Sequence, residues 1–173
     1  SKNYSLPIRF ATLTHDLGKG TTPTEEWPRH IGHEARSVQL TQDLCERIKI
    51  PKNERNLALL VAKFHGDVHR AVELKPATIA NMLQAVDAYR KPARFKEFLL
   101  ACSCDFHGRP GYAQKPYPQS ERLNNALAAA NRINAGEIAA SLNKTELQST
   151  DLSTAINTKI REARIASIKT QLT

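Results

Sequence analysis

The chain has 173 residues, and its 25 Lys and Arg against 17 Asp and Glu give a formal net charge of +8. Hydrophobic residues make up 40% and charged residues 24%, which fits one folded domain and excludes wholesale disorder. The apolar runs are too short to cross a membrane and no signal peptide is visible, so we expect no membrane partner. The positive charge indicates an anionic partner such as nucleic acid or a phosphate ester, although a basic protein without one fits equally well.

Apolar residues recur at helical spacing along the chain, and the alternation typical of strands is absent. Residues 6–17 carry apolar side chains on two faces, which predicts a central, buried helix. Residues 18–20 end it, and residues 21–28 are predicted to form a loop. Further helices are expected over residues 34–50, 53–68, 76–86, 92–102 and 120–133.

The composition changes after Gly136, where residues 141–153 are polar with few large apolar side chains. A short amphipathic helix should follow, because Ile156, Ile160 and Ile168 recur at helical spacing beside several Lys and Arg. We favour a solvated terminal helix here over one that packs on the main body.

The three cysteines, Cys45, Cys102 and Cys104, cannot form a disulfide framework. Cys102 and Cys104 also lack the spacing of a zinc knuckle and a second pair. We therefore expect free core thiols in a reducing compartment, and a cytoplasmic protein.

The most specific local feature is the pair His15-Asp16, which ends an otherwise apolar helix. Buried ionisable groups are costly unless they are paired or bind a metal. A His-Asp pair alone is weak evidence for a metal site. Further candidate ligands lie downstream: His30, His33, His65, His69 and Asp105.

These downstream residues have spacings compatible with metal binding. His30 and His33 share a face if that stretch is helical, and His65 and His69 are separated by one helical turn. Two unrelated hydrogen-bonding histidines are the more common explanation for any one such pair. Asp105 is a sharper signal, because it lies at the edge of an apolar helical face. Nitrogen and oxygen ligands without thiolate suit Mg, Mn, Fe, Ni or Zn and select no single metal.

The run from Arg9 to Gly20, RFATLTHDLGKG, resembles the HD superfamily of metal-dependent phosphohydrolases. More narrowly, it resembles the HD region of bacterial CCA-adding tRNA nucleotidyltransferases. Further parts of the match are Trp27-Pro28-Arg29-His30, Gly32-His33, Arg90-Lys91-Pro92, Asp105 and Gly108-Arg109. The resemblance covers roughly residues 6–135.

This resemblance implies an all-α fold with an HD-domain helical bundle over residues 1–135. Residues 136–173 match the family poorly, and their composition predicts a polar linker and a C-terminal helical tail. The resemblance also implies a metal-dependent phosphohydrolase with phosphatase, 2′-nucleotidase and 2′,3′-cyclic phosphodiesterase activities. The expected substrates are tRNA ends or nucleotide phosphate esters. A divalent metal is expected, with Mg or Ni as the first choices and Mn, Fe or Zn as alternatives, and the protein could form a homodimer.

The resemblance also assigns site residues. The HD pair and a late Asp map the metal ligands onto His15, Asp16 and Asp105, and two-metal members add His33 and His65. Lys19 stands where the family often has a phosphate-contacting Lys, and Arg109 would join it in binding substrate. His33 or His65 would complete a second metal site or act as the general acid.

The sequence departs from the family at two points. The family's first metal-binding His precedes the HD pair by a helix, which predicts an N-terminally truncated chain that also lacks the nucleotidyltransferase head. Relatives carry His-Asp where this chain has His65-Gly66-Asp67, so Asp67 either replaces the missing carboxylate or that role is lost. The alternative function is a non-catalytic tRNA-binding helical body that supports the absent head.

Overall fold

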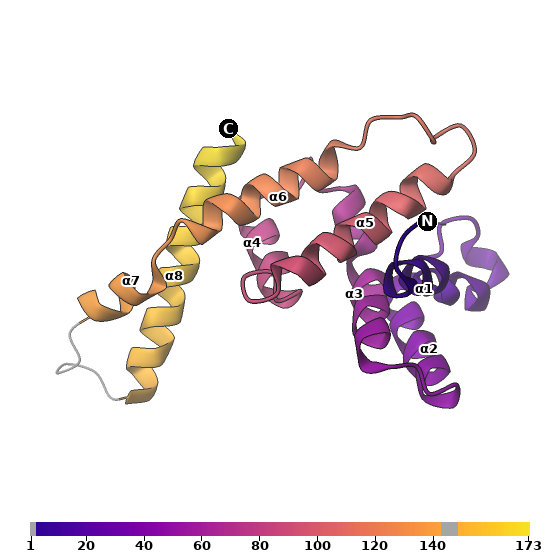
Figure 1. Cartoon of the computed structure of the whole chain (residues 1–173), viewed down its shortest axis with the longest axis horizontal. Helices are drawn as coiled ribbons and strands as arrows, with labels where there is room; N and C mark the ends of the chain where they lie inside the picture. Colours follow the sequence, from indigo (N-terminus) through magenta and orange to yellow (C-terminus); the bar gives the residue numbers. More distant parts are fainter. Residues whose placement is uncertain (1–2, 143–148) are drawn as a thin grey trace. The chain divides into compact units, whose positions relative to one another are not determined.

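The structure, a computed structural model, describes residues 3–142 and 149–173. Every regular element in these residues is a helix, which confirms the predicted all-α fold (Figure 1). With η marking short 3-10 helices, the elements are α1 (Leu6–Thr14), η1 (Leu17–Thr21), η2 (Thr24–Glu26), α2 (His33–Arg47), α3 (Lys52–His69), α4 (Pro76–Ala85), α5 (Pro92–Gly108), α6 (Pro118–Asn131), α7 (Ala135–Ser141) and α8 (Ser149–Leu172). None of the described helices has the length and apolar composition of a membrane span.

The helices pack into two compact units, and each unit draws on two stretches of the chain. The first unit contains residues 1–72 and 91–120, and the second contains residues 73–90 and 121–173. The division at residue 135 that the sequence suggests follows the extent of the family resemblance, and it stays a prediction.

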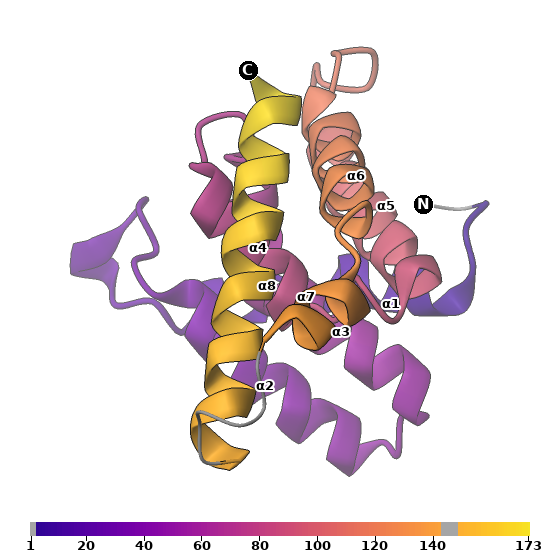
Figure 2. The same ribbon diagram turned by 90° about the vertical axis from the view of Figure 1, so that its left-hand side faces the viewer.

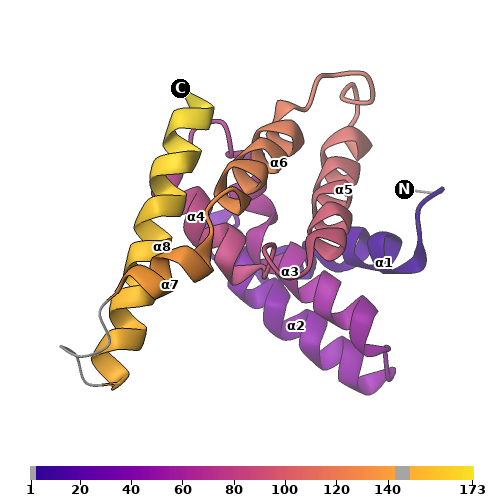
Figure 3. The same cartoon turned by 60° about the vertical axis from the view of Figure 1, so that its left-hand side comes forward.

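Helix α3 is the centre of the first unit, because α1, α2 and α5 all pack on it. Its apolar residues recur around the helix, and Leu57, Val61 and Val68 are fully or almost fully buried. Each such side chain contributes roughly 1.5–3 kcal/mol of burial free energy. His65 lies on the same buried surface, only 4% exposed, so α3 carries both core and candidate site residues. Figure 3 shows α2 lying along α3.

The prediction that the first helix is buried on two faces is wrong for one of them. Ile8 and Ala11 are buried where α1 packs on α3 and α5, whereas Leu6 and Leu13 are 63% and 79% exposed. The packing partners of α1 in the described residues therefore lie on one side only. The helix also ends at Thr14, three residues early; η1 occupies its predicted end, and the predicted loop contains η2.

Helix α2 buries small side chains rather than its leucines, although leucines recur along it at helical spacing. Ser37, Thr41 and Cys45 are buried, and Ile48 is more than half exposed. Small side chains let the chain around η1 approach closely: the Gly18 amide donates to Ser37 Oγ at 2.9 Å. Thr41 Oγ1 donates to the Thr14 carbonyl at 3.3 Å. These contacts hold the end of α1 against the first turns of α2.

In the second unit, α4 and α7 pack on α8 (Figure 2). Ile168 of α8 is fully buried, so the expectation of a solvated terminal helix is wrong. The helix is also longer than predicted and begins inside the polar stretch 141–153, of which residues 143–148 lie outside the described residues. Asn134 caps α7 by accepting hydrogen bonds from the amides of Gly136 and Glu137.

Candidate metal centre

A tight turn after α1 presents the His15-Asp16 pair to the neighbouring helices. His15 follows the last residue of α1, and Asp16 leaves helical geometry with φ −106° and ψ 12°. Gly18 makes the turn possible, since a Cβ there would lie 2.2 Å from the His33 carbonyl oxygen. The local sequence His-Asp-Leu-Gly therefore places the pair beside the N-terminus of α2, where His33 lies.

Three histidines from three parts of the chain direct Nε2 toward Asp16. His15 Nε2 lies 3.2 Å from Asp16 Oδ2. His33 Nε2, from the first residue of α2, and His65 Nε2, from α3, lie 3.3 and 3.5 Å from Asp16 Oδ1. The Nε2 atoms of His33 and His65 are themselves only 3.4 Å apart. The four side chains thus converge on a single point.

Backbone carbonyls fix the tautomers of these three rings. Their Nδ1 atoms lie 2.8–3.0 Å from carbonyl oxygens: His15 on Thr12, His33 on His30 and His65 on Val61. A carbonyl only accepts, so Nδ1 carries the proton and Nε2 of the neutral ring has a free lone pair. Lone pairs aimed at a carboxylate repel it unless a cation lies between them. Metal-ligating histidines are held in this way.

Asp105 of α5 borders the same point from another side. Its Oδ1 lies 3.5 Å from His15 Nε2, and its Oδ2 accepts hydrogen bonds from His69 Nε2 at 2.6 Å and Arg109 Nη2 at 3.0 Å. His69 Nδ1 lies 2.9 Å from the Tyr117 hydroxyl, which can donate to it. His69 thus has the opposite tautomer to the other three rings. It supports Asp105 instead of offering a lone pair to a metal.

The electrostatics of the cluster call for a positive charge. Burial lowers the pKa of His15, but its contacts with Asp105 and Asp16 outweigh burial and raise the pKa to about 9. Burial also raises the pKa of both carboxyls, yet contacts with His15, Lys19 and His69 hold these pKa values well below the usual range. Burial lowers the pKa of His65, and the nearby His15 charge lowers it further. The carboxylates are therefore ionised and His65 keeps its lone pair. Without a metal, His15 carries a second proton on Nε2 between the two carboxylates, and a bound cation would replace that proton.

The residues fit a divalent cation. Ligand atoms of His15, Asp16 and His65 all lie within 4.8 Å of one another. His15 Nε2 and Asp16 Oδ1 are buried and make no well-formed hydrogen bond within the described residues. Buried polar atoms are costly when they are left unsatisfied, and a metal ion would satisfy both. Imidazole and carboxylate together suit Ni, Fe, Mn or Zn.

The sequence profile of the HD domain family matches residues 5–97, more than half of the chain. This range includes all four converging side chains but not Asp105. The chain belongs to the HD domain family. It is also similar to Multifunctional CCA proteins, with 66% identity to that of Nitrosospira multiformis and 62% to that of Nitrosomonas eutropha, each over 99% of this chain and 42% of the relative. The Burkholderia vietnamiensis protein is 48% identical over 99% of this chain and 40% of its own length. The chain thus spans about two fifths of these curated relatives. No solved structure matches significantly.

In this HD domain, the structure brings every predicted ligand position to one cluster: His15, Asp16, His33, His65 and Asp105. Lys19 and Arg109, predicted to bind substrate, lie at its edge. Lys19 Nζ contacts Asp16 Oδ2 at 2.6 Å, and Arg109 contacts Asp105. Both side chains are partly exposed, so they can reach a ligand from solvent. The roles of all seven residues stay predictions.

Two candidates lie outside the cluster. His30 precedes α2 with φ 50°, so it does not share a helical face with His33, and its Nδ1 contacts Thr22 Oγ1. It contributes its carbonyl to His33 instead. Asp67 pairs with Arg70 at 3.0 Å, so it does not replace a metal-binding carboxylate in this structure.

Two supporting residues of the HD domain are difficult to find from sequence. His69 has a visible signal, since it lies one turn after His65, but its role depends on which nitrogen carries the proton. Tyr117 has no signal, because it reaches His69 from 48 residues further along the chain. Only the packing of α3 against α5 and the loop beyond it reveals this contact.

Divalent metal should stabilise the HD domain against heat. An ion that binds only the folded state at ten times its dissociation constant adds about 1.4 kcal/mol to the free energy of unfolding. For a chain of this size, the midpoint of thermal unfolding should rise by roughly 3–6 °C. Differential scanning calorimetry of chelator-treated protein, before and after addition of Ni²⁺ or Mn²⁺, measures this shift. An unchanged midpoint, or an equal shift in Asp16→Asn, would contradict a metal site at this cluster.

Tyr117→Phe should weaken the support of Asp105 without removing a ligand. It deletes the hydroxyl that contacts His69 Nδ1 and retains the ring that packs on Phe106. Loss of such an outer partner typically lowers metal affinity by about 10–100-fold. Isothermal titration with Ni²⁺ tests this, and Tyr112→Phe is the control, because the Tyr112 ring also packs on Phe106 but has no contact with His69. Equal Ni²⁺ affinities of the two variants would show that Tyr117 does not support Asp105 through His69.

Proposed function

We propose that the chain is a metal-dependent phosphohydrolase that acts on nucleotide phosphate esters. The observation that carries the proposal is the convergence of three imidazole Nε2 atoms on the ionised Asp16, each ring held by a backbone carbonyl at Nδ1. Family membership and the identity to Multifunctional CCA proteins support the same reaction class. Specific activities proposed are 2′,3′-cyclic phosphodiesterase, 2′-nucleotidase and phosphatase.

The residues of the site fall into proposed metal ligands and proposed phosphate-binding residues. His15, Asp16, His33, His65 and Asp105 would hold the metal. A bound divalent cation polarises a phosphate oxygen and lowers the pKa of bound water. The imidazole-rich donor set favours Ni or another transition metal over Mg, whose preferred ligands are oxygens.

Lys19 and Arg109 would bind the phosphoryl group. Each is anchored to a carboxylate of the cluster, which orients its charge toward the point of convergence. There they would offset negative charge that develops on the phosphoryl oxygens. His33 Nδ1 is bonded to a backbone carbonyl and its Nε2 is directed at Asp16, so a ligand role suits it better than that of general acid.

The experiment is hydrolysis of 2′,3′-cyclic AMP by chelator-treated protein and by protein reloaded with Ni²⁺, Mn²⁺ or Mg²⁺. We expect no product after chelation and restored hydrolysis with a transition metal. A rate that is the same in all four samples would overturn the proposal.

The proposed natural substrate is a 2′,3′-cyclic phosphate or a 2′-phosphate at the end of an RNA. The first RNA to test is tRNA, because the chain is similar to Multifunctional CCA proteins. The alternative, a tRNA-binding body without catalysis, predicts binding that weakens steeply with salt and no hydrolysis under any metal condition. A cytoplasmic location and a homodimer also stay predictions.

A further inference from the structure

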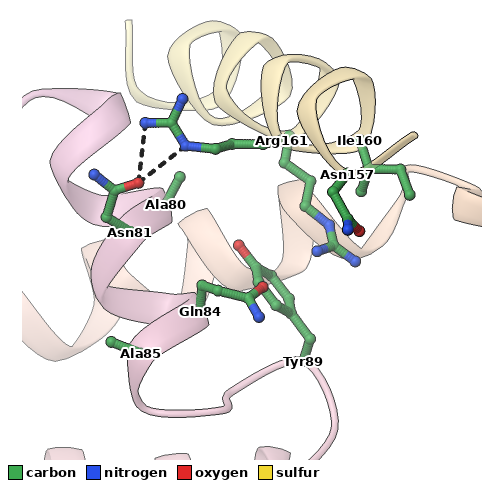
Figure 4. Close-up of a pocket in the computed structure, with 9 residues that line it drawn as sticks. Ala80, Asn81, Gln84, Ala85, Tyr89, Asn157, Ile160 and Arg161 are labelled. Carbon is green, nitrogen blue, oxygen red and sulfur yellow. Dashed lines mark hydrogen bonds between the residues drawn. The ribbon is translucent and has the colours of Figure 1, made fainter. Parts of the chain in front are cut away.

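A cavity lies within the second unit, between α4 and α8 (Figure 4). Its volume is about 520 Å³, which falls in the range of small-molecule sites. The polar lining consists of two arginines, three amides and a tyrosine: Arg161, Arg164, Asn81, Gln84, Asn157 and Tyr89. None of the nine lining residues is acidic. The cavity therefore offers positive charge together with groups that both donate and accept hydrogen bonds.

Arg164 has an unused donor in this cavity. Its guanidinium lies 3.9 Å from the centre of the Tyr89 ring, a cation–π contact that holds the group flat. Its Nε is buried and has no hydrogen-bond partner among the described residues. A buried donor without a partner costs free energy, and an oxygen of a bound anion would recover it. Stacked arginines keep their edge free for planar recognition of phosphate.

Arg161 is held in place by α4. Its Nε and Nη2 both donate to Asn81 Oδ1, at 3.1 and 3.0 Å, as Figure 4 shows. No hydrogen bond within the described residues uses its Nη1. Arg161 and Arg164 lie three residues apart on α8, so their side chains project from the same face of the helix. Two oriented guanidinium groups thus border one cavity.

We propose that this cavity binds a nucleoside phosphate, with the phosphate on Arg161 and Arg164. The amides of Gln84 and Asn157 would bond the edge of the base, since an amide pairs with both donors and acceptors. The ligand can be a free nucleotide or one nucleotide of a single-stranded RNA, which present the same chemistry. The residues are separate from the metal cluster, so the proposal goes beyond the proposed hydrolysis and does not depend on it.

The direct test observes the Arg164 side chain in the intact 173-residue chain. Protein labelled with ¹⁵N is titrated, in the presence of a chelator that keeps the metal cluster empty, with AMP, a six-nucleotide single-stranded RNA and inorganic phosphate. The Arg164 Nε–H signal, identified by its loss in Arg164→Lys, should shift with AMP or RNA and much less with phosphate. A larger shift with RNA assigns the site to RNA, and one with AMP assigns it to free nucleotide. No shift with either, or an equal shift with phosphate, overturns the proposal.

Variants measure the contribution of each arginine. Arg161→Gln and Arg164→Gln should each weaken binding of a fluorescent RNA hexamer or AMP analogue by at least about tenfold, because each loses charge-assisted hydrogen bonds. The matched control is Lys159→Gln, which removes an exposed charge from α8 outside the cavity and should change affinity by less than about twofold. Equal losses in all three variants would show non-specific charge and overturn the proposal.

Circular dichroism melts of each variant check the fold, since Arg161 also links α4 to α8. The conservative Arg161→Lys and the wild-type titration keep the test decisive where a glutamine variant unfolds. Hydrolysis of 2′,3′-cyclic AMP, measured in parallel, should be unaffected by these substitutions. Loss of nucleotide binding with intact hydrolysis in these variants shows that the cavity acts separately from the cluster around Asp16. Intact nucleotide binding would overturn the proposal for the cavity and leave the proposed hydrolysis untouched.

Discussion

His15→Ala is expected to lower metal-dependent hydrolysis of 2′,3′-cyclic AMP by about 10³-fold, the effect of losing several kcal/mol of metal-based stabilisation. His15 is the ring that contacts both carboxylates, with Nε2 at 3.2 Å from Asp16 and 3.5 Å from Asp105. Its removal leaves the partly buried carboxylates of Asp16 and Asp105 without the imidazole that contacts both of them. Steady-state rates with saturating Ni²⁺, together with the bound metal per chain, measure the effect.

His107→Ala is the matched control for this substitution. His107 lies on α5 two residues after Asp105, but its ring nitrogens contact the carbonyls of Ser103 and Lys115 rather than the cluster. Its rate and bound metal should stay within about twofold of wild type, since it contacts no proposed ligand. If both alanine variants lost activity equally, or if His15→Ala retained full activity and metal, the assignment of the cluster would fail.

The candidate site residues His15, Asp16 and Asp105 can be predicted from sequence because each carries a local signal. His15-Asp16 ends an apolar helix, and Asp105 follows an apolar face, so the sequence alone indicates that ionisable groups are buried at both places. Side-chain periodicity does not reveal which helices meet, however. The convergence of His33 and His65 follows from a family resemblance, and the structure supplies the distance of 3.4 Å between their Nε2 atoms.

The sequence misleads where packing overrides hydrophobicity. Leu13 fits an apolar helical face yet is 79% exposed, because α1 packs on one side only. Ser37 and Thr41, which look like surface residues, are fully buried because η1 and the end of α1 require a close approach to α2. The tautomer of a histidine depends on hydrogen-bond partners that can be distant in sequence, as Tyr117 is from His69. A sequence pattern therefore cannot give it.

Gly18→Ala is expected to damage both stability and the cluster. An added Cβ would lie 2.2 Å from the His33 carbonyl oxygen and 2.6 Å from the Ser37 amide, both backbone atoms of the first turns of α2. Because backbone cannot rotate away, η1 must separate from α2 and move Asp16 from His33. We expect a loss of about 1–3 kcal/mol or more in the free energy of unfolding, as overpacking gives. Hydrolysis should fall by about 10²-fold, because shifts near 1 Å misalign reacting groups.

Gly20→Ala isolates this steric cause from the loss of glycine itself. Gly20 lies in the same 3-10 helix, but nothing lies within 4 Å of an added Cβ there, and its φ is not positive. Since alanine restricts the unfolded chain more than glycine does, Gly20→Ala should be neutral or stabilising by about 0.4–1 kcal/mol. Urea unfolding and cyclic AMP hydrolysis compare the two variants directly. Equal stability and activity would mean that the close approach of η1 to α2 does not position Asp16, and the link from this turn to the metal centre would be wrong.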